Sequence, residues 1–278
     1  MKAVCRYLAA LMAALLLVTA AAAGLAAFMT TGVFLREVSG TTALTAQQQA
    51  RIDAAAEALT ETWGLSADTL RSWTDGAAEK QAAVMAAWWQ ELWHSPEADG
   101  YMPAFLDAAA ERELIAAIMQ DEGFRALTAE SQRRAIARDE IAYALDEAVC
   151  GAVTPLRRSI VDAAVSVAAE RLDLPLIRRM VLLGAAVLAV IGLALLVPAH
   201  RLAGSALLTA GSLMALCAVP VWLLDIPGML AQLSEIAAMQ GRNALAVLGI
   251  LWLGAAAALM ALGTVIICVK RAIRGSKC

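Results

Sequence analysis

One pair of residues in the chain has a spacing that helical metal sites use. Glu91 and His94 lie three positions apart, as do the carboxylate and imidazole ligands of di-iron helical bundles. Such a centre needs the motif twice, and His94 is the only histidine between the first two apolar stretches of the chain. We therefore expect no metal site and no other cofactor.

The densest aromatic group of the sequence adjoins this pair. Trp89 and Trp93 would share one face of a helix, whereas Trp88 would point elsewhere. We favour packing of these bulky rings into an alanine-rich core. A position at the membrane interface, where tryptophan is enriched, and an aromatic wall for a ligand are the alternatives. All three residues are therefore candidate interface contacts.

Adjacent carboxylates form a third group of interest. They occur in the pairs Asp121-Glu122, Asp139-Glu140 and Asp146-Glu147. None has the spacing of a calcium-binding loop, so we expect them to face water, with a cation or a basic partner as the alternative. Residues 34–179 contain 23 acidic and 14 basic side chains, a net charge of −9. This charge repels nucleic acid, and we expect no binding to it.

The sequence contains no local signature of an enzyme. The patterns GxSxG, GxGxxG and the phosphate-binding P-loop are all missing, and we assign no catalytic residue. Only one of the five cysteines, Cys150, lies between the first two apolar stretches. We expect it to be a buried core residue, with a bridge between two copies as the alternative.

Four uncharged apolar stretches must position these side chains. They cover residues 7–32, 180–199, 202–224 and 244–269. Each reaches the roughly 20 residues that a helix needs to cross a bilayer, and a helix satisfies its own backbone hydrogen bonds there. We therefore expect an all-α protein with four transmembrane helices. The first stretch exceeds the apolar core of a signal peptide, roughly 7–15 residues, so an uncleaved anchor is favoured over a cleaved leader.

Charge is distributed along the chain as in a multi-pass membrane protein. All acidic residues lie between Glu37 and Glu235, whereas the N-terminal arm, the turn after residue 199 and the C-terminal tail carry seven basic residues and no acid. Because basic loops stay in the cytoplasm, we expect both termini there. Arg178 and Arg179 are exceptions at the outer end of the second span, where their side chains would reach headgroup phosphates.

Three parts follow from this pattern. They are an N-terminal transmembrane anchor (residues 1–33), an extracytoplasmic helical bundle inserted between the first and second spans (34–176) and a three-helix transmembrane domain (177–278). In the bundle, Thr45 and Gln48 form a capping box that predicts a helix start, Gly64 predicts its end, and Pro103 predicts the first turn of a later helix. The expected helices cover residues 45–63, 66–73, 77–94, 103–122, 128–150 and 154–172.

The connection between the last two spans has its own pattern. Residues 225–241 predict a short amphipathic helix that ends at Gly241. Met229 and Leu233 lie on its apolar side and Gln240 lies away from it. We expect this side to rest on the membrane surface or under the extracytoplasmic domain, so Met229 and Leu233 are candidate contacts.

The last three spans contain no ionisable side chain other than cysteine, and this absence argues against a coupled transporter. They carry many small residues. Small residues allow helices to approach closely. The glycines concerned are Gly184, Gly192, Gly204, Gly211, Gly249, Gly254 and Gly263, and Gly254 with Ala258 forms one small-xxx-small match.

These observations indicate an integral protein of the bacterial cytoplasmic membrane. The bacterial source is inferred from an excess of arginine over lysine, 18 to 4, and from a single asparagine, Asn243. We expect a non-enzymatic sensor, regulator or assembly factor whose acidic domain binds a partner, either another membrane protein or a second copy. The alternatives are an accessory subunit of a transporter or envelope machine, and an enzyme acting on lipid or wall precursors.

Overall fold

A computed structural model describes residues 2–98, 100–154, 158–232 and 234–275. Nearly all of these residues are helical and none of them forms a strand, which confirms the all-α prediction. The chain divides into two units. The apolar unit comprises Met1–Thr31, Leu174–Asp225 and Ala244–Cys278, and the polar unit comprises Gly32–Asp173 and Ile226–Asn243.

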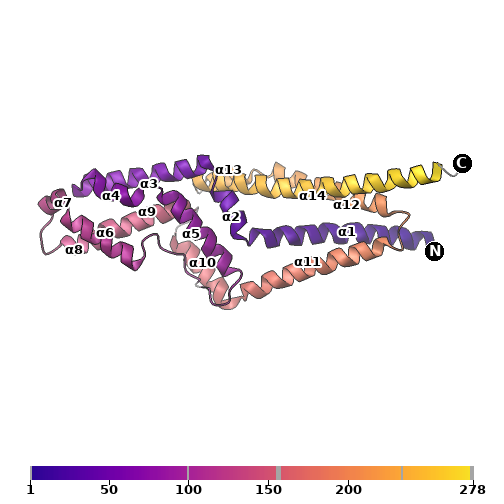
Figure 1. The fold of residues 1–278 in the computed structure, drawn as a ribbon, viewed down its shortest axis with the longest axis horizontal. Helices are drawn as coiled ribbons and strands as arrows, with labels where there is room; N and C mark the ends of the chain where they lie inside the picture. The colour runs from indigo at the N-terminus through magenta and orange to yellow at the C-terminus, as the bar shows by residue number, and fades with distance from the viewer. Residues whose placement is uncertain (1, 99, 155–157, 233, 276–278) are drawn as a thin grey trace. The chain divides into compact units, whose positions relative to one another are not determined.

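Four long helices build the apolar unit (Figure 1). They are α1 (Lys2–Met29), α11 (Leu174–Leu196), α12 (Ala203–Leu223) and α14 (Glu235–Gly275), of which the last begins in the polar unit. All four are long and apolar enough to cross a membrane, as the four uncharged stretches predicted. Both termini and the turn between α11 and α12 lie at one end of this unit.

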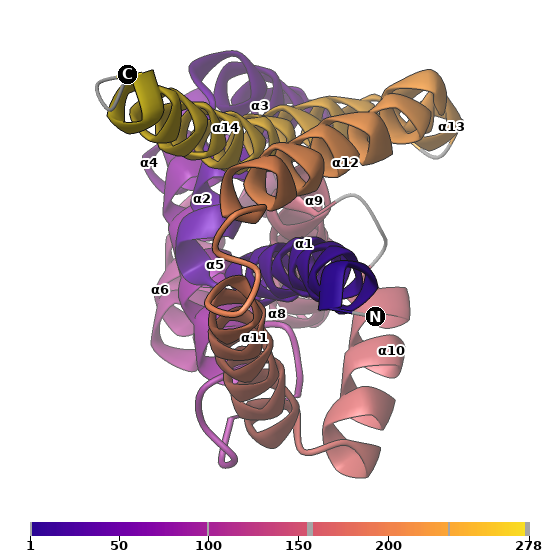
Figure 2. The same ribbon diagram turned by 90° about the vertical axis from the view of Figure 1, so that its right-hand side faces the viewer.

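Helix α1 lies beside both α11 and α12, and α12 also lies beside α14; Figure 2 shows these helices nearly end-on. Glycines allow the contacts of α1 with α11 and of α12 with α14. A Cβ added at Gly263 of α14 would lie 2.6 Å from the carbonyl oxygen of Gly204 in α12, and one at Gly192 of α11 would lie 3.3 Å from the carbonyl oxygen of Ala13 in α1. By contrast, Gly184 and Gly254 meet nothing within 4 Å, so the Gly254–Ala258 match is not used in this packing.

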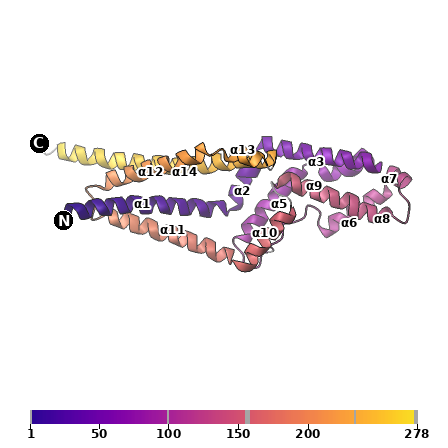
Figure 3. The same ribbon diagram turned by 180° about the vertical axis from the view of Figure 1, so that it is seen from behind.

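Short helices build the polar unit (Figure 3). They are α2 (Gly32–Ser39), α3 (Thr42–Trp63), α4 (Ala67–Thr74), α5 (Ala77–Leu92), α6 (Ala108–Gln120), α7 (Glu122–Leu127), α8 (Arg133–Ile136), a π-helix (Ala137–Ala142), α9 (Tyr143–Val153), α10 (Arg158–Arg171) and α13 (Ile226–Ala231). The first turns of α14, through Asn243, complete the unit.

Large apolar side chains fill the core of the polar unit. One cluster joins α3, α4, α6, α7 and the π-helix with α9 around fully buried Phe124, Leu114, Ile118, Ile141 and Leu145. Two smaller clusters continue between α3, α5 and α9, and Cys150 is buried in one of them. The expected fifth helix, 128–150, is present as α8 and α9, but the π-helix interrupts it.

Three of the predicted helix starts are wrong. The fifth helix, expected from Thr128, begins at Arg133. The capping box does not form: α3 begins at Thr42, and Gln48 is fully buried on its core side. Pro103 does not open a helix. Instead the carboxylate of Asp107 accepts hydrogen bonds from the amides of Ala109 and Ala110 and so caps α6. The predicted end at Gly64 is confirmed, since this residue has a left-handed backbone with φ of 64°.

Candidate functional site

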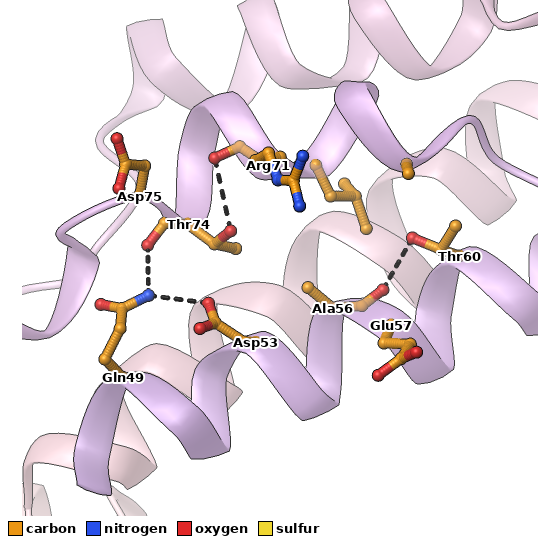
Figure 4. Close-up of a pocket in the computed structure, with 10 residues that line it drawn as sticks. Gln49, Asp53, Ala56, Glu57, Thr60, Arg71, Thr74 and Asp75 are labelled. Carbon is orange, nitrogen blue, oxygen red and sulfur yellow. Dashed lines mark hydrogen bonds between the residues drawn. The ribbon is translucent and has the colours of Figure 1, made fainter. Parts of the chain in front are cut away.

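A half-open groove of about 570 Å³ lies between α3 and α4 of the polar unit (Figure 4). We call it the α3–α4 groove. Its lining residues are Gln49, Asp53, Ala56, Glu57, Thr60, Ala67, Leu70, Arg71, Thr74 and Asp75. The apolar residues Ala56 and Leu70 are buried and belong to the main core cluster, so the floor of the groove is the packed core itself.

One end of the groove is fixed by the Gln49 side chain. Its Nε2 donates to Oδ1 of Asp53 and to the carbonyl oxygen of Thr74, both at 2.8 Å (Figure 4). Its Oε1 accepts from the backbone N–H of Ala78 at 3.2 Å. Gln49 therefore ties α3 to the end of α4 and to the first turn of α5, which holds the two groove walls at a set separation.

The charged groups of the groove form no ion pairs among the described residues. Three exposed carboxylates, Asp53, Glu57 and Asp75, and one exposed guanidinium, Arg71, line it. Among the described residues none of the four side chains forms an ion pair, and only Asp53 accepts a side-chain hydrogen bond. A groove with a net charge of −2 and one positive group can bind a ligand that carries ammonium or guanidinium groups and offers one acceptor to Arg71.

Asp121 anchors the far end of α4. Its carboxylate accepts from Ser66 N at 2.9 Å, Thr69 Oγ1 at 2.7 Å and Phe124 N at 3.1 Å. Burial acts to raise its pKa, but these hydrogen bonds outweigh burial and lower the pKa to about 2. The expectation that the doublet Asp121-Glu122 simply faces water is therefore wrong for Asp121, which joins α4 to the start of α7.

The other two doublets differ from each other in burial. Asp146 is buried, and its Oδ1 accepts the backbone N–H of Leu106 at 2.9 Å. Asp139 is exposed and pairs with its neighbour Arg138 at 2.7 Å. Hydrogen bonding to Arg138 lowers the pKa of the Asp139 carboxyl. A carboxylate that caps a loop amide cannot be recognised from an acidic pair alone.

The three tryptophans lie together at the C-terminal end of α5, apart from the α3–α4 groove: Trp88 and Trp89 lie in the helix, and Trp93 directly follows its last residue. The Trp89 and Trp93 rings meet edge-on with centroids 5.8 Å apart, and the Trp88 and Trp89 centroids are 6.4 Å apart. Trp88 packs against the core cluster that contains Cys150. All three rings are half-buried, so core packing and surface exposure are combined at this site.

Glu91 and His94, the pair with the spacing of helical metal sites, lie at the end of α5 and two residues after it. Both side chains are exposed, and Nδ1 of His94 lies 2.6 Å from the carbonyl oxygen of Gln90. No group of three or more metal-ligating side chains occurs among the described residues.

The connection before the last long helix is shorter than the sequence predicted. Helix α13 ends at Ala231, and Gly241 lies inside α14, where a Cβ would meet Leu230 Cδ1 at 2.5 Å. Met229 is 61% exposed, and Leu233 lies outside the described residues. The first turns of α14, which belong to the polar unit, bond to other helices of that unit.

Amides at the start of α14 make those contacts. The Gln240 side chain, expected to face away, is buried, and its Nε2 donates to the carbonyl oxygen of Val153 at 2.9 Å. Asn243 Nδ2 donates to the carbonyl oxygen of Val38 at 2.9 Å, and Glu235 pairs with Arg51 of α3 at 3.6 Å. The hydrophobic periodicity of the sequence did not predict the bonds of Gln240 and Asn243. Their partners are carbonyl oxygens near the ends of helices that lie far away in the sequence.

Comparisons with known proteins assign no class and no particular relative: no family model, no curated protein and no solved structure matches this chain. The interpretation of the site therefore depends on its geometry.

Proposed function

We propose that the chain is a multi-pass protein of the bacterial cytoplasmic membrane, with both termini in the cytoplasm and the polar unit outside. Four helices of sufficient length and hydropathy support the membrane placement. The end of the apolar unit that holds both termini and the α11–α12 turn also carries the basic residues Lys2, Arg6, Arg201, Lys270 and Arg271. Retention of basic loops in the cytoplasm supports the orientation.

We propose further that the protein is a non-enzymatic sensor, regulator or assembly factor, and that the α3–α4 groove binds a cationic segment of a partner protein. The observation that carries this proposal is the groove itself: Asp53, Glu57 and Asp75 surround a floor of core residues, and none of the three forms an ion pair within the described part of the chain. Charge complementarity of this kind selects partners and speeds their association.

The length of α14 and its hydrogen bonds within the polar unit support a role in transmitting partner binding at the groove. Gln240 and Asn243 bond to α9 and α2 of the polar unit, and the same 41-residue helix continues to Gly275. A change in the polar unit that alters these two hydrogen bonds would act directly on a helix that reaches the basic end of the apolar unit.

A crosslinking experiment in native membranes tests the groove. A photoreactive amino acid replaces Ala67, an exposed lining residue, in the full chain, and the adducts are quantified. Combining it with Glu57→Gln and Asp75→Asn should lower the adduct yield about tenfold, since two charged contacts are lost. The matched control is Glu61→Gln, an exposed acid of α3 outside the groove, which should leave the yield unchanged.

The result also separates the alternatives. Loss of the adduct in both the groove variant and the control would contradict a specific groove. An adduct with a transporter subunit or envelope machine would assign the protein to that assembly as an accessory subunit. An adduct whose yield is independent of salt would contradict binding through exposed charges.

A further inference from the structure

A second hollow, in the apolar unit, has the lining of an acyl-chain site. It measures about 460 Å³ and lies between α1, α11 and α14, which Figure 2 shows nearly end-on. The described residues that line it are all alanines and leucines: Ala21, Ala185 and Ala189 are among the alanines, and Leu17 and Leu262 are among the leucines. The hollow is open on one side, and none of these described residues brings a polar side chain to it.

A positive group stands above the hollow on the same helix. Arg178 precedes Ala185 by seven residues and Ala189 by eleven, and these spacings place all three on one face of α11. At a rise of about 1.5 Å per residue, the two alanines lie about 10 and 16 Å below Arg178 along the helix. An acyl chain that hangs from a headgroup at Arg178 would therefore pass along the hollow.

The Arg178 guanidinium is held in position but is not neutralised. Its Nε donates to Oγ1 of Thr30 at 3.1 Å, at the end of α1, and the buried Thr30 hydroxyl donates to the carbonyl oxygen of Ala27 at 2.6 Å. Arg178 is half-buried and forms no ion pair within the described part of the chain. The two remaining amino groups of the fork match the spacing of phosphate oxygens.

We propose that this seam is a binding site for one anionic phospholipid, with its phosphate on Arg178 and one acyl chain in the alanine-lined hollow. A phospholipid satisfies both observations at once, because it supplies a negative group above and an apolar chain below. A transmembrane helix from a second copy would fill the hollow and leave the guanidinium without an anion. This inference rests on the proposed membrane placement of the apolar unit.

Photolabelling of the full chain tests the site. The protein is reconstituted into phosphatidylcholine vesicles that contain phosphatidylglycerol with a diazirine near the end of one acyl chain. After irradiation, labelled residues are mapped by mass spectrometry. We expect labelling to concentrate on the hollow, at residues 17–21, 185–189 and 255–262. Phosphatidylcholine that carries the same diazirine should label these residues much less.

Two variants test the two halves of the site. Arg178→Gln should lower labelling of the hollow by phosphatidylglycerol about tenfold, because a bidentate charged contact is lost. Arg179→Gln, which removes the same charge at the same depth from an exposed neighbour, is the matched control and should change it less than about twofold. Ala189→Phe should fill the hollow and lower its labelling; Ala189→Leu gives the same test with less added volume.

Three outcomes would overturn the proposal. Equal labelling by both lipids would show that the site does not recognise an anionic headgroup. Equal effects of the two arginine variants would show that Arg178 is not the specific contact. Crosslinks between two copies at the hollow would assign it to a helix. In each case, continued labelling of outward-facing Val190 and Leu193 would show that the membrane placement still holds, whereas absence of label from every span would contradict the placement itself.

Discussion

Each of the two units of this protein is stabilised by its own kind of internal packing. In the apolar unit, glycines let backbones meet, as at Gly204 and Gly263, and the described side chains add few polar bonds between helices. In the polar unit, large side chains around Phe124 fill the core, and buried carboxylates such as Asp121 and Asp146 bond to backbone amides. The difference agrees with the proposed placement of the apolar unit in a membrane, because lipid offers little hydrophobic gain for burying a leucine and close approach of the helices then supplies most of the contact.

The largest expected effect tests the core of the polar unit. Phe124→Ala removes a fully buried ring and should cost about 3–5 kcal/mol of unfolding free energy, because it leaves a cavity. Hydrogen exchange of α6 and α9 in the full chain under increasing urea would measure it. Val84→Ala, at an exposed position on α5, is the control and should change little. Equal losses would mean that the core does not lie around Phe124.

In the apolar unit, the corresponding test adds a side chain at a helix contact, whereas Phe124→Ala removes one from a core. Gly263→Leu places a side chain against the backbone of α12 and should cost about 1–3 kcal/mol or more through overpacking. Gly254→Leu, on the same helix but facing open space, should cost little. Recovery of folded protein after heating in detergent would distinguish the two. If Gly254→Leu proves as harmful as Gly263→Leu, the pairing of α12 with α14 is wrong.

A pH series examines the carboxylates that the polar unit buries. Its hydrogen bonds hold the pKa of Asp121 at about 2 in the folded chain, below the ordinary value of 3.8, so its contribution to stability is present above about pH 4 and is lost as the pH falls toward 2. The shift corresponds to about 2 kcal/mol. Asp121→Asn should therefore speed amide exchange at Ser66 and Phe124 at pH 7 and reduce the acid dependence of that exchange. The exposed Asp68→Asn should leave both unchanged.

The smallest expected effect concerns two buried glutamines, Gln48 and Gln81, which differ in their hydrogen bonding. Neither end of the Gln48 amide has a hydrogen-bond partner among the described residues, whereas Gln81 Nε2 donates to the carbonyl oxygen of Pro103 at 3.2 Å. Gln48→Leu should leave the unfolding free energy unchanged or raise it by about 1 kcal/mol, and Gln81→Leu should lower it by about the same amount. Urea unfolding measured in parallel would show the difference. A loss at Gln48→Leu would contradict an unbonded amide.

The sequence predicts the parts of this fold that repeat locally and misses those that depend on distant contacts. Hydropathy located the four long helices, because each apolar stretch is defined by its own composition. Gly64 was predicted as a helix end since its left-handed backbone is a local property. Asp121 and Gln240 were missed as structural groups, because Ser66 and Val153 become adjacent to them only on folding. Asp107 was also missed, although its partners Ala109 and Ala110 lie two and three residues further along and its capping role is a local property.

The candidate site was harder to predict than the fold. The sequence directed attention to Trp88, Trp89 and Trp93, which are conspicuous by type. The α3–α4 groove is lined by common residues, and Gln49 becomes informative only when its three bonds to α3, α4 and α5 are seen. Such a groove has no spacing pattern, because its walls are separate helices whose pairing is set by the core beneath them.

The central claim is that the polar unit faces the extracytoplasmic side while the basic ends of the apolar unit face the cytoplasm. Single cysteines can be placed at Glu130 of the polar unit and at Arg271, both exposed, in a chain whose native cysteines are replaced by serine. A membrane-impermeant thiol reagent should label Glu130→Cys in intact spheroplasts and Arg271→Cys only after the membrane is permeabilised. Labelling of Arg271→Cys in intact cells, with Glu130→Cys protected, would contradict the account.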